Sequence, residues 1–110
     1  MKMEKKIINL MPCPVNLILE DSERVFPVSG KVARCFSNFE TIKSFDGVPI
    51  TRRRFGNVIG LPKETPGTKY IVMQAVAEAC PERNDLLVPM APDRDTDGRI
   101  KGYYYLAILS

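Results

Sequence analysis

The chain contains no histidine and no tryptophan, and its three cysteines stand far apart in the sequence. The absence of histidine removes the usual base partner of a nucleophile and the commonest metal ligand. Three thiols, Cys13, Cys35 and Cys80, form neither a paired zinc motif nor an even disulfide framework, so we interpret them as reduced. We therefore expect no metal, no cofactor and no thiol catalysis.

Long apolar runs are missing as well, because no stretch approaches the ~20 apolar residues that span a bilayer. The beginning of the chain, Met1–Leu10, is too short in its apolar part for a signal peptide. These features predict a protein that stays in the cytoplasm of the cell that makes it, with no membrane partner. A length of 110 residues with ordinary hydrophobic and charged content predicts one globular domain, residues 1–110.

Nine prolines and seven glycines interrupt the chain at short intervals, which predicts brief strands. Two Asp-Gly pairs, Asp46-Gly47 and Asp97-Gly98, each lie between runs that read as strands and favour the tight turns of antiparallel hairpins. The predicted strands are residues 6–10, 15–19, 24–26, 31–36, 40–45, 50–59, 69–72, 86–88 and 99–108.

One segment has helical rather than strand-like spacing of its apolar residues. Val72, Val76, Ala79 and Cys80 fall on one stripe, and Pro81 disfavours continuation of the helix. So short a helix needs a sheet to pack on. The predicted fold is α+β: a small β-rich single domain, mainly an antiparallel sheet or a partly closed barrel, with one short helix near residues 72–80.

Two segments resemble ligand loops in part. Asp93–Gly98 has the oxygen ligands and glycine that open a calcium loop, but its twelfth position is Tyr104 instead of glutamate, which favours a hairpin turn. Ser29–Lys31 resembles the end of a phosphate-binding loop. The first glycine that such a loop requires is absent, because Val25 occupies its position. Both segments are better explained as turns.

The acidic residues give no catalytic pattern, since no recurring spacing ties any two of them together. An enzyme that acts through carboxylates is therefore only the third hypothesis, and a non-enzymatic role is preferred. The acids considered for it are Glu40, Asp46, Glu78, Asp85 and Asp93.

The densest positive charge is Arg52-Arg53-Arg54, and strand alternation places Arg52 and Arg54 on one face. Two guanidinium groups on one face could hold a phosphate or carboxylate, and we predict Arg34, Arg52 and Arg54 as contacts of an anionic ligand. The alternative is a solvated strand face. A net charge of +3 is too modest for us to expect sequence-specific nucleic-acid binding.

Three successive tyrosines, Tyr103, Tyr104 and Tyr105, alternate across a predicted strand, so at least one should face outward. Exposed tyrosine suits a partner surface. The alternative role of these residues is ordinary cross-strand packing.

The order of motifs along the chain resembles a group of small uncharacterised proteins of bacteriophages and prophages. The resemblance rests on residues 8–15 (INLMPCPV), 26–34 (FPVSGKVAR), 55–62 (FGNVIGLP), 67–72 (GTKYIV), 85–89 (DLLVP), 94–95 (RD) and 98–100 (GRI). It covers most of the chain, but members often carry histidine where this chain has Cys13. The tyrosine-rich end after Gly102 differs from the group.

The resemblance implies a phage context, in which small accessory proteins often neutralise a host component, either a protein of a defence system or a nucleotide signal. Our leading hypothesis is a non-enzymatic binding protein that captures an anionic nucleotide-like ligand or blocks a host protein. The second hypothesis is a structural module that self-associates, or pairs with a host protein, through the strand that carries Tyr103–Tyr105.

Overall fold

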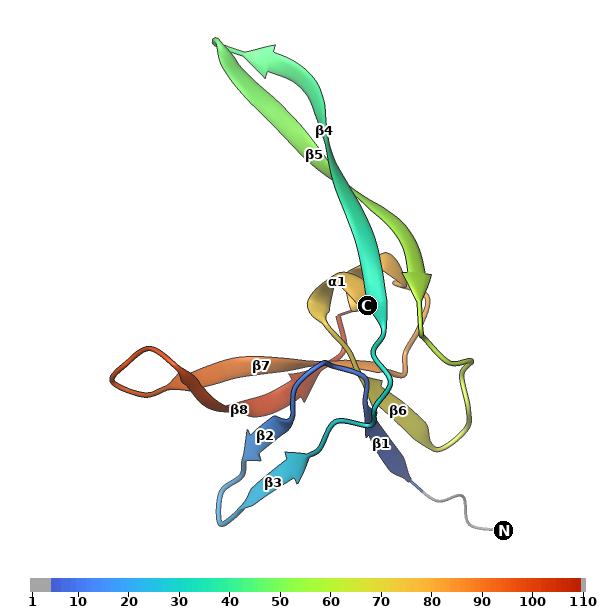
Figure 1. The fold of residues 1–110 in the computed structure, drawn as a ribbon, viewed down its shortest axis with the longest axis vertical. Coiled ribbons are helices and arrows are strands. Elements are labelled where there is room, and N and C mark those ends of the chain that lie inside the picture. The colour runs from blue at the N-terminus through green and yellow to red at the C-terminus, as the bar shows by residue number, and fades with distance from the viewer. Residues whose placement is uncertain (1–4, 110) are drawn as a thin grey trace.

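The structure, a computed structural model, describes residues 5–109, with the side chain of residue 37 excepted. In this range the chain forms strands β1 Lys6–Asn9, β2 Val15–Ile18, β3 Glu23–Phe26, β4 Arg34–Phe45, β5 Val48–Ile59, β6 Thr68–Ile71, β7 Leu86–Arg94 and β8 Ile100–Ala107, with helix α1 Gln74–Ala79 before β7. The nine elements form a body and a long two-stranded arm, β4–β5, that projects from it (Figure 1).

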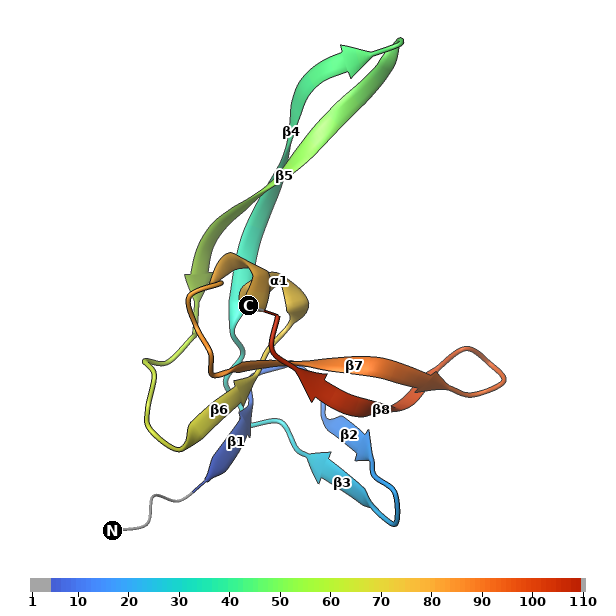
Figure 2. The same ribbon diagram turned by 180° about the vertical axis from the view of Figure 1, so that it is seen from behind.

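Six strands make the sheet of the body, in the order β1-β6-β7-β8-β2-β3. Strand β1 pairs with β6, β6 with β7 and β2 with β8 in parallel, whereas β7–β8 and β2–β3 are antiparallel hairpins. The sheet is therefore mixed, and the prediction of a mainly antiparallel one is corrected for the body. The partly closed barrel is not shown, because the strand order is open at β1 and β3 (Figure 2).

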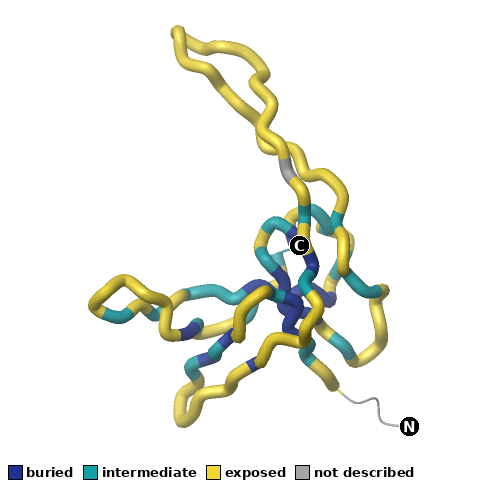
Figure 3. Tube along the Cα trace, in the orientation of Figure 1, coloured by how far each residue is buried: buried dark blue, intermediate teal, exposed yellow. Residues whose placement is uncertain are grey.

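The core has two sides because alternate residues of β6 and β7 point to opposite faces of the sheet. On one side, Tyr70 and Leu86 pack with Val76 of the helix. On the other side, Ile71 and Leu87 pack against the β2–β3 hairpin. Strands β6 and β7 are thus buried on both faces, and the dark segments at the centre of Figure 3 lie here.

Helix α1 has only six residues and packs its buried pair, Val76 and Ala77, onto the sheet. It begins two residues after the predicted start at Val72, because the Val72 N–H donates to the Leu87 carbonyl at 2.9 Å and still belongs to the sheet. It ends at Ala79, with Cys80 as its C-cap, directly before Pro81. The position predicted for the helix, near residues 72–80, is confirmed.

The arm differs most from the expected brief strands. The predicted strands 31–36 and 40–45 are one continuous 12-residue strand, β4, which pairs with the 12 residues of β5. Its turn is the predicted Asp46-Gly47 pair, with positive φ values of 51° and 75°. The arm makes the molecule extended: its radius of gyration is 16.8 Å, against about 13 Å for a compact chain of this length.

The second predicted hairpin, β7–β8, is also present. Its loop contains the calcium-like segment, and Asp95 Oδ1 accepts the N–H groups of Asp97 and Arg99 at 2.9 and 3.0 Å. Arg94 Nη1 donates to the Gly98 carbonyl at 2.8 Å. These bonds are those of a turn. Within residues 5–109 no group of three or more acidic or thiol side chains is arranged to hold a metal ion.

Candidate functional site

The β4–β5 arm carries most of the exposed apolar side chains. Of the fifteen exposed large hydrophobic residues in the described chain, eight lie in this 26-residue segment. Phe39 and Phe45 are the most open, at 72% and 71% exposure. The other six are Phe36, Ile42, Val48, Ile50, Phe55 and Ile59. So dense a set of exposed apolar groups is typical of an interaction surface.

The register of the arm determines which arginine shares a face with which neighbour. Arg52 lies opposite Glu40 and Arg54 lies opposite Asn38, so these four side chains share one face. Arg53 lies opposite Phe39 on the other face. The predicted alternation is confirmed, but one of the two arginines already has a carboxylate partner, since Arg54 Nε donates to Glu40 Oε2.

Arg53 holds the middle of the arm near the body. Its guanidinium carbon lies 4.8 Å from the centre of the Phe55 ring, and Nη1 lies 3.9 Å from Glu78 Oε2 on helix α1. Cys35 and Val58 at the base of the arm pack against the core that includes the helix. The part of the arm beyond Arg53, residues 40–52, extends away from the body (Figure 1).

Arg34 is the third predicted anion contact, and the structure places it at the base of the arm, opposite Ile59. It lies four positions before Asn38 along β4, and Asn38 faces Arg54. At about 3.3 Å per residue the backbone separation is about 13 Å. Arg52 and Arg54 are therefore neighbours, whereas Arg34 is not brought next to them.

The arm also carries the net charge of the protein. Residues 34–59 contain five basic and two acidic residues, a net +3, and the remaining eleven basic and eleven acidic residues sum to zero. The basic residues of the arm are Arg34, Lys43, Arg52, Arg53 and Arg54, and its acids are Glu40 and Asp46. An arm that is both basic and apolar is suited to a partner with acidic and apolar groups.

The three tyrosines lie on β8 and differ in environment. Tyr103 is half-buried and packs against the core beside β2 and β3. Tyr104 and Tyr105 are 50% and 55% exposed. Strand β8 lies between β7 and β2 and is not an edge strand, so an added strand would find its free edges on β1, β3 and the arm instead.

Three cavities of about 380, 180 and 320 Å³ lie in the body. The largest, between β1 and β6, is lined by Lys5, Lys6 and Lys69 together with Ile7 and residues 67–68. None of the three is lined by an arginine or a carboxylate of the described chain. The arginines of the arm thus occupy a projecting surface and not one of these cavities.

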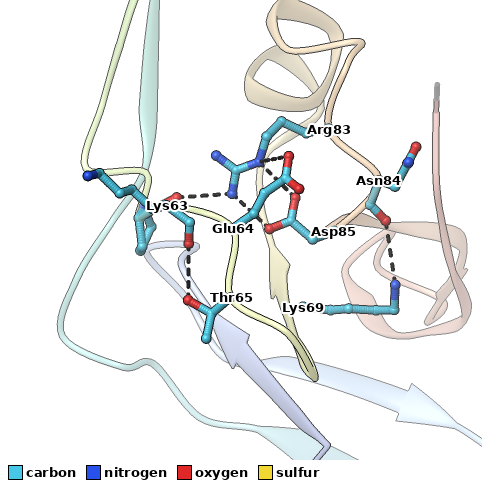
Figure 4. Close-up of polar contacts among 8 residues, drawn as sticks. Lys63, Glu64, Thr65, Lys69, Arg83, Asn84 and Asp85 are labelled. Carbon is cyan, nitrogen blue, oxygen red and sulfur yellow. Dashed lines mark hydrogen bonds and ion pairs between the residues drawn. The ribbon is translucent and has the colours of Figure 1, made fainter.

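A largely buried ion pair that the sequence did not single out lies at the foot of β7. Arg83 binds Asp85 through two hydrogen bonds of 2.8 and 2.7 Å, and its Nη2 also donates to the Pro62 carbonyl (Figure 4). The hydrogen bond from Arg83 holds the pKa of Asp85 below its usual value, although burial opposes this shift. The positive charge of Arg83 lowers the pKa of Asp85 as well.

The position of this pair indicates what it does. Pro62 and Glu64 belong to the segment that returns from β5 to β6, and Arg83 Nε lies 3.4 Å from Glu64 Oε1. The pair therefore ties the return from the arm to the start of β7. Asp85, one of the acids considered for catalysis, has a structural role here. The short spacing of opposite charges at positions 83 and 85 was the one sequence signal for it.

The three cysteines are free, with Cys13 exposed and Cys35 and Cys80 partly buried. Burial, followed by the charge of Glu82, raises the pKa of the Cys80 thiol. A raised pKa keeps this thiol protonated at neutral pH and makes it a poor nucleophile.

Comparison with protein-family models, with curated proteins and with solved structures finds no match. No helix among the described residues has the length and apolar character needed to cross a membrane.

Proposed function

We propose that the protein is a non-enzymatic binding protein that holds a protein partner on its β4–β5 arm. The observation that supports this is the composition of the arm. Four of the five phenylalanines of the chain lie in it, all exposed, together with four arginines. Aromatic residues and arginine are the types enriched at the centres of protein–protein interfaces, where they contribute most of the binding energy.

A protein partner fits the geometry better than a small anion does. Arg54 already has Glu40 as a partner, Arg53 is directed to Glu78, and Arg34 lies far from both along the strand. A small phosphate could reach two of these groups at most. A protein surface can extend along the arm and cover its phenylalanines as well.

The exposed position of the arm supports the same proposal. A two-stranded hairpin alone in water is marginally stable at best. Beyond Arg53 the arm leaves Phe45, Val48 and Ile50 in solvent. A partner that covers these side chains would stabilise the distal arm and gain affinity from their burial.

The kind of partner follows from charge and context. An apolar surface with acidic residues at its rim would complement the arginines. The resemblance to phage proteins implies a host protein as one such partner. The tyrosines of β8 are a second candidate surface, because Tyr104 and Tyr105 are both exposed, one on each face of the strand.

The test is native mass spectrometry of the tagged protein purified from cells. We expect a stoichiometric complex with a protein for the wild type. The double variant Phe39→Asp/Phe45→Asp should lose it, because it places charge where apolar groups are buried, while the Tyr104→Asp control should retain it. Loss of the complex in the Tyr104→Asp control alone would show that the partner binds at β8 and not at the arm. A phosphorylated small molecule in place of a protein would favour anion capture instead.

A further inference from the structure

We propose that the partner of the β4–β5 arm is the β2–β3 hairpin of a second copy of this chain. This inference rests on the proposed function and identifies its partner. It follows from three properties of the β2–β3 hairpin, residues 15–26: its charge, its exposed apolar side chains and its free edge.

The two hairpins have opposite charge. The β2–β3 hairpin contains three acids, Glu20, Asp21 and Glu23, and one base, Arg24, a net charge of −2. All three acids are exposed, and Arg24, which is exposed as well, has its guanidinium carbon 4.6 Å from the centre of the Phe26 ring. The residues outside the arm and this hairpin carry a net charge of +2, so this hairpin offers the basic arm an acidic counterpart.

The apolar side chains and the backbone are also complementary. Val25 and Leu19 are exposed beside the acids, as Phe45, Val48 and Ile50 are exposed beside Arg52 on the arm. Strand β3 is the terminal strand of its sheet, and both strands of the arm have an outer edge. An arm strand can therefore add to β3 by backbone hydrogen bonds, with arginines facing acids and apolar groups facing apolar groups.

Direct pairing of two arms is the competing arrangement for a second copy. It would bring two segments of net charge +3 together, and like charges in contact oppose association. Contact between an arm and a β2–β3 hairpin removes this repulsion.

The shape of the molecule determines which assembly the contact between arm and hairpin can form. The arm and the β2–β3 hairpin lie toward opposite ends of the long axis, which measures 57 Å, so they cannot meet within one chain (Figures 1 and 2). Two molecules placed side by side and antiparallel bring each arm to the other's hairpin. A two-fold axis then relates two equal contacts, and the assembly is a closed dimer.

The experiment is a charge exchange measured by sedimentation velocity. The arm variant Arg52→Glu/Arg54→Glu and the hairpin variant Glu20→Lys/Asp21→Lys should each be monomeric, whereas the wild type is a dimer. An equimolar mixture should form a heterodimer, because each arm then faces a hairpin of opposite charge in both contacts. Restored association also shows that both variants fold. The charge-reversed control Lys31→Glu/Lys63→Glu, outside both hairpins, should remain a dimer.

A dimeric hairpin variant, or a mixture that stays monomeric, would overturn the inference. So would a wild type that is monomeric at its highest soluble concentration. If that monomer still forms a complex with another protein through the arm in cells, the proposed function stands and only the second copy is wrong. If the arm variant and the wild type behave alike in both measurements, both proposals fail.

Discussion

Arg53 lies directly across the β4–β5 ladder from Phe39, and it is the last arginine of the arm that contacts the body. On the same face its guanidinium lies over the Phe55 ring and reaches Glu78 of α1. The proximal arm is therefore fixed to the helix, while the distal arm is held by its own ladder. This division explains why the arm can be long, exposed and still directed away from the body.

The same substitution at a buried and at an exposed phenylalanine should change the free energy of unfolding by very different amounts. Phe26 is 6% exposed and Phe39 is 72% exposed. Phe26→Ala should lower the free energy of unfolding by about 3–5 kcal/mol, and Phe39→Ala by no more than about 0.5 kcal/mol. Urea unfolding measures both. A large loss for Phe39→Ala would show that the arm is part of the folding core instead of a free surface.

The Arg83–Asp85 pair should contribute to the pH dependence of stability. The pKa of Asp85 is lower in the folded chain than its unfolded value of about 3.9. Its contribution is therefore complete above that unfolded value and is lost as the pH falls through the folded pKa. Asp85→Asn should lower the free energy of unfolding by about 1–3 kcal/mol at pH 7.

Urea unfolding at neutral and acidic pH tests this prediction. The difference between Asp85→Asn and the wild type should shrink in strong acid, where Asp85 is protonated in both states of the wild type. A difference that is independent of pH would mean that Asp85 stabilises the fold by packing and not by its charge.

Gly60 should tolerate no side chain, because φ is +77° and an added Cβ would lie 2.4 Å from the Val32 carbonyl oxygen. Gly98 has a similar φ of +81° but open space around it. Gly98→Ala should cost about 1 kcal/mol from backbone strain alone. Gly60→Ala should lower the melting temperature further, since backbone atoms at the base of the arm must move. Equal melting temperatures would contradict the close approach.

The thiols should differ in reactivity. Cys13 is exposed, whereas burial raises the pKa of Cys80 and lowers its thiolate fraction. Iodoacetamide at neutral pH should label Cys13 first and Cys80 more slowly, and the two rates should converge in urea. Mass spectrometry of the labelled peptides measures the order. Equal labelling rates in the folded protein would contradict the raised pKa.

The parts of the fold that depend on local chemistry could be predicted from the sequence. Asp46-Gly47 and Asp97-Gly98 specify tight turns by their own conformational preferences, and Pro81 limits the helix. The parts that depend on distant partners could not. Nothing in the segment of β1 indicates that it pairs in parallel with β6. The gap that we predicted at residues 37–39 is absent, because β4 continues through it in its pairing with β5.

The candidate site shows the same limit. Alternation placed Arg52 and Arg54 on one face, as the register confirms. Their distance from Arg34 and the pairing of Arg54 with Glu40 depend on the register of two strands, which the sequence does not specify. The exposed arm could not be predicted either. Phe36, Phe39 and Phe45 are residue types that usually form a core, and only the three-dimensional arrangement shows that they lie outside it.

The central claim, that the arm is the contact surface, is tested most directly by photo-crosslinking in cells. A benzoylphenylalanine in place of Phe45 should give one discrete protein adduct, and the same group in place of Ile108, which is also exposed but lies outside both hairpins, should give none. If the proposed dimer is correct, the crosslinked protein should be a second copy of this chain. If the arm binds a different partner, the crosslinked protein should be that other protein. Adducts of equal yield at both positions, or none at position 45, would contradict the account.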